Sequence, residues 1–510
     1  MNLNIQRVSK TGIYPVLVRT CGDIVGNRTA SRRWLRQVPN IIGGEHVYGE
    51  PSFPVYSPDE PPEILHTTTN LTDFETTIPR VLNLAEKGFK QWSKKSYVEK
   101  ADIFQKVVVN LEQSRDEMIK SQVEIGMPTW FADFNVNGAI AQVRECMSQL
   151  STPDGIIPKS LTSDLSLILK QPVGPVLSIA PWNAPIILAA RSICAPLAAG
   201  CSVVLKPSEK SPLPFYLITK CFLDAGIPVN ALQLVNVKPK DNPEFIEKVL
   251  SSGTIRKLNF TGSTTVGRKI SMVAAKYHIP YLLELGSKNY SIVDKDANIP
   301  KAVENIIKSA WSHKGQICMS TDKVYIHESI YNDFKSTLIK LAETTRKHQE
   351  YQICQRAPEM SAKIIELVND ALNNGAKIIS GNYLPESIVE TNIVEPIILE
   401  GVKRNTRLDV TELFGPVFSV SPFSDPHELI NDLNSLNESG LKVSIWSSDI
   451  LNAIDLAKSI EAGGVHINGS TVHDEVTIPH GGIKYSGNGR FNSFWGVNEF
   501  CNIKTITVNK

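Results

Sequence analysis

The chain has 510 residues, which is too long for a single hydrophobic core and predicts two or three domains. Apolar residues make up 42% and charged residues 21%, as in an ordinary globular protein, and 53 basic against 52 acidic residues leave a net charge of +1. This balance gives no electrostatic reason to expect nucleic acid or an anionic membrane as a partner.

The ten histidines and eight cysteines show no ligand-spaced cluster and no CxxC pair, so we expect no metal site. A reducing compartment is the simpler interpretation of these cysteines. The most apolar stretch, 175–205, contains Pro181, Pro185 and Pro196 and cannot form one continuous membrane-spanning helix.

The first 36 residues are strongly basic and contain a single acidic residue, Asp23. Their basic residues are Arg7, Lys10, Arg19, Arg28, Arg32, Arg33 and Arg36. With no long apolar segment among them, this composition fits a mitochondrial transit peptide better than a secretory signal. The alternative is a basic extension without a targeting role, in which case the expected location is the cytoplasm.

Helical periodicity comes first in the chain, and an alternation of strands and helices follows. Amphipathic helices are expected at 73–96, 98–123 and 138–150, and a strand at 160–170. Expected strands then follow at 173–180, 201–206, 232–237, 257–261 and 281–285, with helices at 184–199, 213–225, 243–251 and 265–277. This alternation predicts an α/β fold with a parallel, doubly wound sheet.

A second series of similar composition predicts a second α/β domain. Its expected helices are 300–313, 328–347, 359–375, 427–437 and 450–461, and its expected strands are 323–327, 376–379, 417–421, 442–446 and 464–467.

Two strand ends carry residues suited to a nucleotide. Lys206 and Glu209 follow a strand, and nucleotides bind at the carboxyl edge of open α/β sheets. A carboxylate there can accept hydrogen bonds from a ribose; the alternative is a surface ion pair. Gly262 and Ser263 lie between a strand and a helix, where free amides and the helix dipole favour phosphate, although a plain capped helix would look the same.

A thiol and a carboxylate suggest acyl chemistry. Glu284 ends a strand, and Cys318 follows 34 residues later in Gly-Gln-Ile-Cys. A thiol that attacks a carbonyl needs an accessible thiolate, donors for the oxyanion and a base for water. Cys318 and Glu284 supply the first and the last, and the Asn183 side chain with the Cys318 amide are the candidate donors. Taken alone, such a cysteine is more often an inert buried residue.

Together these segments resemble the aldehyde dehydrogenase family from about Pro39 to the C-terminus. The matching segments, in the family's order, are PWNAP at 181–185, LKPSE at 205–209, FTGSTTVGR at 260–268, ELGSK at 284–288, GQIC at 315–318 and ELFGP at 412–416. The resemblance implies a Rossmann-like NAD-binding domain, an α/β catalytic domain and a small β oligomerisation flap. The implied boundaries are a basic extension at 1–37, the NAD-binding domain at 38–152 and 174–286, the catalytic domain at 287–490, and the oligomerisation segment at 153–173 and 491–510.

The resemblance also implies residue roles. Cys318 corresponds to the nucleophile, Glu284 to the general base and Asn183 to the oxyanion donor. The cofactor-binding positions are Trp182, Lys206, Ser208, Glu209, Gly262, Ser263, Gly267, Glu412 and Phe414. The cofactor is expected to be NAD, because Glu209 disfavours a 2′-phosphate, although in this family such a carboxylate leaves NADP use open.

A narrower resemblance is to the branch that oxidises aromatic aldehydes such as salicylaldehyde, vanillin and benzaldehyde. It rests on the segments 466–475, 479–484 and 486–490, and on Arg191, where that branch has an arginine near the substrate. The alternative for Arg191 is a helix-surface residue paired with a carboxylate. The chain departs from the common pattern at Ser287, Ser470, His480 and Tyr485.

Ser287 replaces a glycine beside Glu284, where its side chain could crowd the backbone or bond to the carboxylate. This leaves three hypotheses: an aldehyde dehydrogenase for aromatic substrates, a semialdehyde or CoA-acylating member, and a nucleotide-binding protein without turnover. The retained Glu284 disfavours the acylating reading. The tail 502–508 resembles the family's terminal strand, which pairs with the 160–170 hairpin, so a homodimer or homotetramer is expected.

Overall fold

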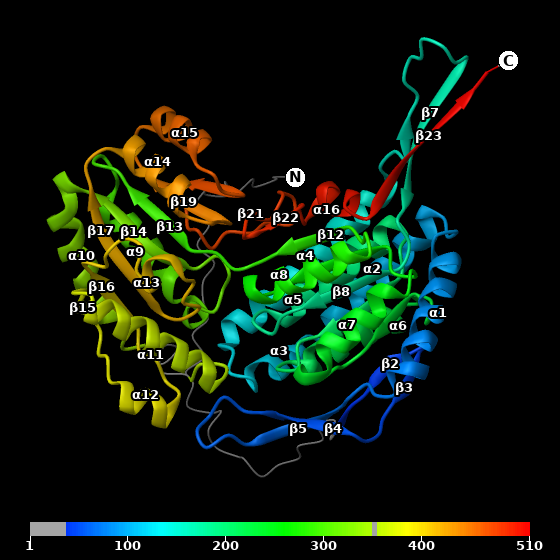
Figure 1. Cartoon of the computed structure of the whole chain (residues 1–510), viewed down its shortest axis with the longest axis horizontal. Coiled ribbons are helices and arrows are strands. Elements are labelled where there is room, and N and C mark those ends of the chain that lie inside the picture. Colours follow the sequence, from blue (N-terminus) through cyan, green and yellow to red (C-terminus); the bar gives the residue numbers. More distant parts are fainter. Residues whose placement is uncertain (1–36, 349–353, 510) are drawn as a thin grey trace, which may run out of the picture. The chain divides into compact units, whose positions relative to one another are not determined.

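The computed structural model describes residues 37–348 and 354–509, and the predicted transit segment lies outside them. Among the described residues, no helix combines the length and apolar character needed to cross a membrane. The chain builds two large sheets, a β-ribbon near its C-terminal end, and a small sheet of β1 (Gln37–Val38), β4 (Ser52–Tyr56) and β5 (Ile64–Thr69). The predicted α/β class is confirmed (Figure 1).

The first large sheet has eight strands in the order β22-β12-β11-β8-β9-β10-β2-β3, and its five strands from β12 to β10 run parallel. Those five are β8 (Val176–Ala180), β9 (Val203–Pro207), β10 (Leu232–Leu234), β11 (Lys257–Thr261) and β12 (Tyr281–Glu284). The edges are completed by β2 (Asn40–Ile42), β3 (Glu45–Val47) and β22 (Gly487–Asn488). Near-continuous apolar runs form the central strands because both faces are covered.

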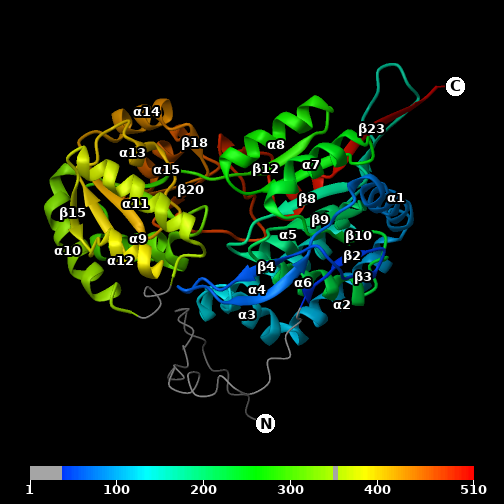
Figure 2. The ribbon, with the colours of Figure 1, turned by 60° about the horizontal axis from the view of Figure 1, so that its bottom comes forward.

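The strand order reverses at β8, and this reversal places the helices. The chain moves outward from β8 to β10 and then returns to β11, so right-handed connections put α5 (Pro185–Ala199) and α6 (Pro212–Asp224) on one face. The same rule puts α7 (Asn242–Ser251) and α8 (Thr264–Lys276) on the other face, where α1 (Phe74–Trp92) joins them around a shared apolar core. Figure 2 shows α7 and α8 on the opposite side of the strands from α2 and α4.

Two predicted helices differ from the structure. The helix expected over 98–123 is divided into α2 (Tyr97–Gln113) and α3 (Arg115–Val123), because Ser114 between them leaves helical geometry at φ −93° and ψ 9°. The helix expected at 138–150 begins earlier, as α4 (Thr129–Ser148), directly after Pro128. A proline fits the start of a helix since it has no N–H to donate.

The second large sheet has seven strands in the order β15-β16-β17-β14-β13-β19-β20, all parallel except β15. They are β13 (Asn289–Val293), β14 (Thr321–His327), β15 (Lys377–Ser380), β16 (Ile397–Glu400), β17 (Val417–Phe423), β19 (Lys442–Trp446) and β20 (Gly464–Ile467). One face packs on α9 (Ile299–Trp311) and α10 (Tyr331–Thr345), and the other on α14 (Pro426–Leu436) and α15 (Ile450–Ser459). Beside β16 lie α11 (Pro358–Asn373) and α12 (Pro385–Thr391).

The C-terminal strand β23 (Cys501–Val508) pairs antiparallel with β7 (Leu165–Pro172) along its whole length, and β6 (Gly155–Ile156) adds a short third strand. The expected pairing of the tail with the 160–170 region is therefore present within one chain, although the strand begins at Leu165. The β7–β23 ribbon projects away from the eight-stranded sheet (Figure 1).

Candidate active site

The carboxyl ends of β8, β11 and β12 converge where the strand order reverses. Asn183 follows β8, Gly262 and Ser263 follow β11, and Glu284 is the last residue of β12. Strands beside a reversal leave a crevice at this edge, because their connections run to opposite faces of the sheet. The fold thus brings these strand-end residues, far apart in sequence, into one region.

A cavity of about 300 Å³ lies at this edge. It contains the three predicted catalytic residues, Asn183, Glu284 and Cys318. Its remaining lining residues are Pro181, Trp182, Leu188, Thr261, Gly262, Ser263, Gly286, Glu359, Met360, Lys363, Glu412, Leu413 and Phe414. Five predicted cofactor residues, Trp182, Gly262, Ser263, Glu412 and Phe414, are therefore brought together with the predicted catalytic ones.

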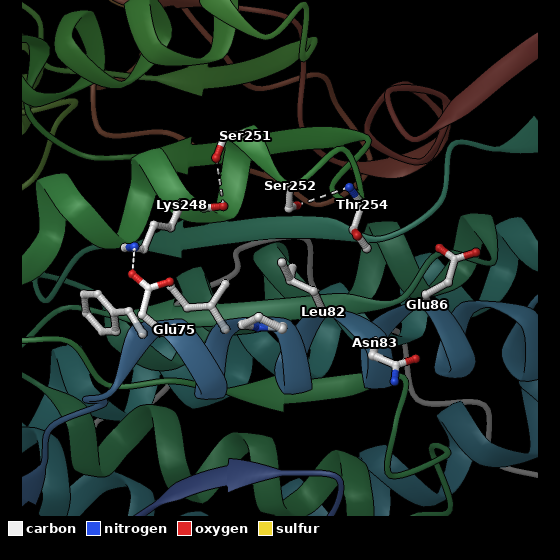
Figure 3. A pocket seen from close by; sticks show the side chains of 11 residues that line it. Glu75, Leu82, Asn83, Glu86, Lys248, Ser251, Ser252 and Thr254 are labelled. Atoms are coloured by element: carbon white, nitrogen blue, oxygen red, sulfur yellow. Dashed lines mark hydrogen bonds and ion pairs between the residues drawn. The ribbon is translucent and has the colours of Figure 1, made fainter.

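A larger pocket of about 500 Å³ lies between α1 and the end of α7 (Figure 3). It contains none of the predicted site residues, and its charged lining includes an ion pair between Lys248 and Glu75. None of the described cysteines lines this pocket, and the predicted catalytic residues lie together in the smaller cavity, which is therefore the candidate active site.

The turn before Cys318 has an unusual backbone. His313, Lys314 and Gly315 follow α9 with φ of 49°, 58° and 70°, three consecutive residues in the left-handed region. Such conformations are costly for residues with a side chain and persist only where the surroundings enforce them. Lys314 is held by the carbonyls of Gly126 and Cys354, and a Cβ on Gly315 would lie 2.1 Å from the carbonyl oxygen of Gly415.

Cys318 itself is partly exposed, and its carbonyl accepts a hydrogen bond of 2.8 Å from Asn289 in β13. Its sulfur, a carboxylate oxygen of Glu284 and a ring nitrogen of His480 all lie within 4.8 Å of one another. Burial, and then the neighbouring Glu284, raise the pKa of the Cys318 thiol well above its ordinary value. The thiol is therefore protonated at neutral pH and needs a base before it can attack.

Glu284 has the opposite tendency. Burial acts to raise its pKa, but His480, Cys318 and Arg191 together lower it below the usual value. The carboxylate is ionised at neutral pH and stands beside the thiol. It can therefore accept a proton from sulfur or from water.

Asn183 is positioned by its own amide group. Its Nδ2 donates a hydrogen bond of 2.9 Å to the backbone carbonyl of Gln316, two residues before Cys318. This bond connects the loop after β8 to the turn that precedes Cys318. The second N–H of the same amide remains available to an oxyanion formed at Cys318.

Glu412 approaches the backbone next to Glu284. Its carboxylate accepts a hydrogen bond of 3.3 Å from the Ser287 amide, and a Cβ on Gly286 would lie 2.3 Å from its Oε2. Burial raises the pKa of Glu412 to about 7. Nearby, the Phe414 and Trp182 rings meet edge to face with centroids 5.9 Å apart.

The other predicted cofactor residues lie outside the cavity lining. Lys206 is buried at the end of β9, and its pKa is lowered by burial while Glu209 opposes that shift. Ser208 accepts a hydrogen bond from the Lys210 amide. Gly267 lies in α8, where a Cβ would meet Leu285 at 2.3 Å, so it permits close packing of helix on sheet.

Ser287 does not bond to Glu284. Its hydroxyl accepts a hydrogen bond of 3.2 Å from the Leu441 amide and lies 3.4 Å from the Ser439 hydroxyl. The expectation that Ser287 could hydrogen-bond the Glu284 carboxylate is therefore wrong, and the serine instead connects the loop after Glu284 to the start of β19.

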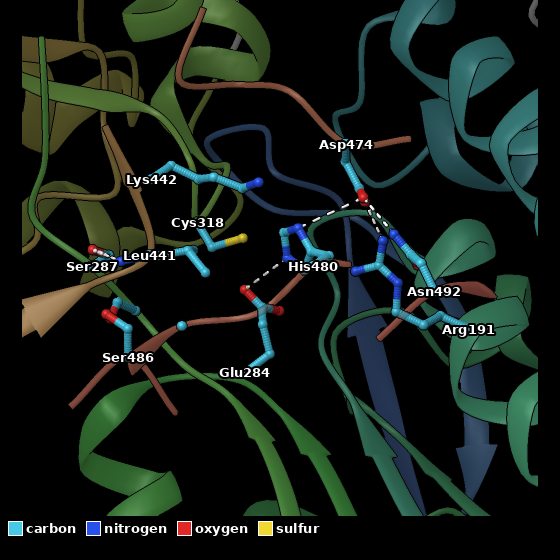
Figure 4. A network of polar contacts seen from close by, with 12 residues as sticks. Arg191, Glu284, Ser287, Cys318, Leu441, Lys442, Asp474, His480, Ser486 and Asn492 are labelled. Atoms are coloured by element: carbon cyan, nitrogen blue, oxygen red, sulfur yellow. Dashed lines mark hydrogen bonds and ion pairs between the residues drawn. The ribbon is translucent and has the colours of Figure 1, made fainter. Parts of the chain in front are cut away.

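Arg191 is buried in α5, with 4% of its side chain exposed, and forms an ion pair with Asp474 (Figure 4). It also lies over the Phe491 ring, 5.5 Å from the centroid. The alternative prediction for Arg191 was a helix-surface residue paired with a carboxylate. The pairing is confirmed, but the residue lies in the interior of the protein instead of on the helix surface.

Three functional candidates were not predicted from the sequence. Asp474 and His480 lie between Arg191 and Glu284, and Lys442 lies near Cys318 (Figure 4). The Lys442 side chain is nearly buried, burial lowers its pKa, and among the described residues its amine has no hydrogen-bond or ion-pair partner. A polar residue in place of an apolar one, as at His480, was the only available sequence signal.

A doubly wound sheet with a thiol, a carboxylate and an amide at its reversal point is typical of nucleotide-dependent enzymes. The comparisons with known proteins make this specific. The family model described as "Aldehyde dehydrogenase family" matches residues 48–506. Similar proteins include a salicylaldehyde dehydrogenase of Pseudomonas sp. strain C18, 36% identical over 83% of this chain and 88% of that protein. A vanillin dehydrogenase of Pseudomonas fluorescens is 35% identical over the same shares.

Solved structures agree. A salicylaldehyde dehydrogenase from Pseudomonas putida G7 complexed with salicylaldehyde has a TM-score of 0.89 and 32% identity, covering 93% of this chain and 99% of that chain. An NAD+ complex of an aldehyde dehydrogenase from Bacillus cereus has a TM-score of 0.85 and 26% identity, covering 93% and 96%. The chain belongs to the aldehyde dehydrogenase family. It is accordingly an oxidoreductase that acts on aldehydes with NAD as cofactor.

Proposed function

We propose that the enzyme oxidises its aldehyde through a thioester on Cys318, which water activated by Glu284 then hydrolyses. The observation that carries this proposal is the approach of the thiol to the Glu284 carboxylate within 4.8 Å, in a cavity that also holds Asn183. A protonated thiol beside an ionised carboxylate is the starting state for base-assisted attack.

In the first stage, Glu284 accepts the thiol proton and the sulfur of Cys318 forms a bond to the aldehyde carbon. The carbonyl oxygen becomes an oxyanion, which the Asn183 amide and the Cys318 backbone N–H stabilise. Bound NAD supplies the acceptor for the hydride that leaves the aldehyde carbon, so the acyl group remains on sulfur as a thioester.

Glu284 gives up the thiol proton to solvent before the second stage. In the second stage, Glu284 accepts a proton from a water molecule whose oxygen bonds to the thioester carbon. The carbon–sulfur bond breaks, and the carboxylic acid and the Cys318 thiolate are released. Ser287 does not hinder this stage by bonding to Glu284, since its hydroxyl is engaged with Leu441.

The residues present fit NAD. The Ser263 side chain caps α8 by accepting from the Val266 amide, and the helix start presents free backbone donors of the kind that bind a pyrophosphate. A Cβ on Gly262 would meet the Phe260 ring at 2.6 Å, so only glycine allows this close turn. We assign Lys206, Ser208 and Glu209 to the adenosine ribose, and Glu412 with Phe414 and Trp182 to the nicotinamide riboside.

The proposed substrate is an aromatic aldehyde. The support is the similarity to salicylaldehyde and vanillin dehydrogenases, together with the apolar walls that Leu188, Leu413 and Phe414 give the cavity. The resemblance suggested that Arg191 contacts the substrate. In this proposal Arg191 acts indirectly, by forming an ion pair with Asp474.

A second candidate is an aldehyde that carries an acidic group, either a phenol or the carboxylate of a semialdehyde. The specific observation is Lys442, a nearly buried amine near Cys318 that forms no hydrogen bond or ion pair among the described residues. A buried ammonium would bind a phenolate or carboxylate through a charge-assisted hydrogen bond.

The test is NADH formation by the purified protein with benzaldehyde, vanillin, salicylaldehyde, a medium-chain aliphatic aldehyde and succinic semialdehyde. We expect steady turnover on the ring-bearing compounds and none in Cys318→Ala. A single NADH per site without turnover would contradict the Glu284 step. No NADH with any aldehyde, although NAD binds, would leave only a nucleotide-binding protein.

We also propose that the protein is a homodimer or homotetramer assembled through the β6–β7–β23 sheet. This sheet and the loop between its strands expose Ile156, Ile157, Leu161, Leu165, Ile503, Ile506 and Val508. Exposed apolar strands are a liability unless another subunit covers them. Sedimentation velocity of the full chain and of Ile503→Lys/Ile506→Lys should give an oligomer and a smaller species, respectively.

A further inference from the structure

We propose that His480, oriented by Asp474, is a positioning residue that keeps Glu284 ionised for the hydrolysis step and takes onward the proton that Glu284 accepts from water. This inference rests on the proposed function, because it assigns a partner to the general base of that mechanism.

The three side chains form a row in the structure (Figure 4). The Nε2 atom of His480 lies 3.8 Å from Glu284 Oε1, and its Nδ1 atom lies 3.6 Å from Asp474 Oδ1. Glu284 and His480 are both almost completely buried. No other imidazole has a described contact with the Glu284 carboxylate.

The far end of the row is fixed. Asp474 forms an ion pair with Arg191 and accepts a hydrogen bond of 2.8 Å from Asn492. The His480 backbone makes two hydrogen bonds with Phe491, of 3.2 Å and 2.7 Å. The His480 backbone and the Asp474 carboxylate are therefore both fixed in place, and Asp474 has a defined position from which to orient the imidazole.

Both Glu284 oxygens and both His480 ring nitrogens are buried without a hydrogen-bond partner. Buried polar atoms without partners are costly, so four of them on two neighbouring side chains call for an explanation. The two gaps exceed a hydrogen bond by less than about 1 Å. Catalytic hydrogen bonds are often long before substrate binds and tighten in the reacting complex.

The proton path follows from the arrangement. A carboxylate at Nδ1 favours a proton on that nitrogen, which leaves Nε2 facing Glu284. When a water proton moves to Glu284, the water oxygen bonds to the thioester carbon and the carbon–sulfur bond breaks. The same proton can then pass from Glu284 to His480 Nε2, where the resulting imidazolium lies between two carboxylates. Glu284 is again ionised, and atoms and charges balance.

The other charged and titratable groups near this pair stay constant in the test. Glu284 also interacts with Cys318, Arg191, Lys442 and Glu412, and His480 also interacts with His466. Since His480 contributes strongly to lowering the pKa of Glu284, its removal should raise that pKa, so that the base is protonated at a higher pH than in the parent enzyme.

The experiment compares the parent enzyme with His480→Phe, which keeps an aromatic ring without nitrogen atoms, and with His480→Gln, which keeps a donor but accepts no proton. Stopped-flow NADH formation with vanillin separates the burst, which reports thioester formation, from the steady rate, which reports hydrolysis. His473→Gln is the matched control, because this imidazole lies on the same loop and contacts Glu475 instead.

We expect His480→Phe to keep the burst, lose roughly tenfold or more in steady rate at pH 7, and shift the acid limb of the steady-rate profile upward by about one pH unit. His480→Gln should show the same loss of rate with a smaller shift of the limb. His473→Gln should match the parent enzyme.

A steady rate and pH profile of both His480 variants within twofold of the parent enzyme would overturn the proposal. If His480→Phe misfolds and does not bind NAD, the steady rate and pH profile of His480→Gln, which is the milder substitution, decide between the two outcomes. Failure of the proposed function is a different result, in which the parent enzyme gives no NADH with any aldehyde.

Discussion

Replacing Arg191 by methionine tests the anchor of the Arg191–Asp474 pair. The change keeps the length and apolar stem of the side chain but leaves the Asp474 carboxylate, 16% exposed, without its cation. Burial favours the neutral form of this carboxyl, but Arg191 and His480 hold its pKa far below the usual range. Removal of the arginine therefore leaves an uncompensated buried charge.

Breaking a buried pair by removing one partner costs about 3–5 kcal/mol. Asn492 and His480 still face the carboxylate, so we expect the lower end, about 3 kcal/mol. Unfolding entropy of about 2.1 cal/mol/K per residue over 510 residues is about 1.1 kcal/mol/K, which converts this loss to a fall in Tm of about 3 °C.

The assay is a double-mutant cycle of Arg191→Met, Asp474→Asn and the double variant, with the free energy of unfolding measured in urea. Because the double variant contains neither charge, it should cost about as much as either single change. A double cost that equals the sum of the singles within about 0.5 kcal/mol would refute the coupling.

The pH dependence gives an independent check. A carboxyl with a depressed folded pKa stabilises the protein fully above its unfolded pKa, and this stabilisation is lost as pH falls through the folded pKa. The difference between the parent enzyme and Arg191→Met should therefore be complete at neutral pH and decline below about pH 4. A difference that grows in acid would contradict the assignment.

Three further predictions concern the cofactor, the nucleophile turn and the substrate. Burial raises the pKa of Glu412 to about 7, so the carboxylate that is proposed to hold the nicotinamide ribose becomes ionised between pH 6 and pH 8. NAD affinity, measured by quenching of tryptophan fluorescence, should therefore rise about tenfold over this range. Glu412→Gln should show no such rise. Gly315→Ala should lower kcat at least tenfold, which corresponds to a barrier increase of roughly 1.4 kcal/mol, because the new Cβ would collide with the Gly415 carbonyl. The control is Gly375→Ala, which is also at positive φ but has nothing within 4 Å of the new Cβ, and it should keep the parent kcat. Lys442→Met should raise the KM for salicylaldehyde or succinic semialdehyde at least tenfold, because a hydrogen bond to a charged group contributes about 1.5–3 kcal/mol. The KM for benzaldehyde should stay nearly unchanged. Equal increases in KM for all three aldehydes would exclude a charge-recognition role for Lys442.

The sequence predicted the strand-end residues well, because their positions follow from a local rule. Asn183, Gly262 and Glu284 each stand where an apolar strand stops, and the carboxyl ends of parallel strands must meet at one edge. Cys318 was identified from the set of family motifs that occur with it in the sequence, since nothing in its immediate neighbours marks it as reactive.

Strand β13 was not predicted, for a physical reason. Two of its first three residues, Asn289 and Ser291, are polar, yet the structure buries both of them together with Tyr290. Asn289 donates to the carbonyls of Cys318 and Ser320, and Ser291 pairs with Ser444 across the sheet. A strand buried through partners on other strands carries no periodic apolar signal of its own.

The Arg191 network was also out of reach, because its partners are distant in sequence. Asp474 lies 283 residues from Arg191, and His480 lies 196 residues from Glu284 (480 minus 284). The sequence showed only that His480 was unusual. Only the three-dimensional structure, in which the loop that carries His480 packs against the edge of the sheet, shows that Glu284 is its neighbour.

The pairing of β22 with β12 has a consequence for the synthesis of the chain. β12 is the last strand of the parallel part of the eight-stranded sheet, and β22, the strand that covers its outer edge, begins 203 residues later (487 minus 284). At about 5–20 residues per second, that edge stays open for roughly 10–40 s on the ribosome. Open edges pair readily with other chains, so this interval is when the nascent protein is most exposed to aggregation. A chain cut short before residue 480 would lack His480 and keep the open edge permanently, and we expect it to precipitate instead of accumulating as an inactive folded protein.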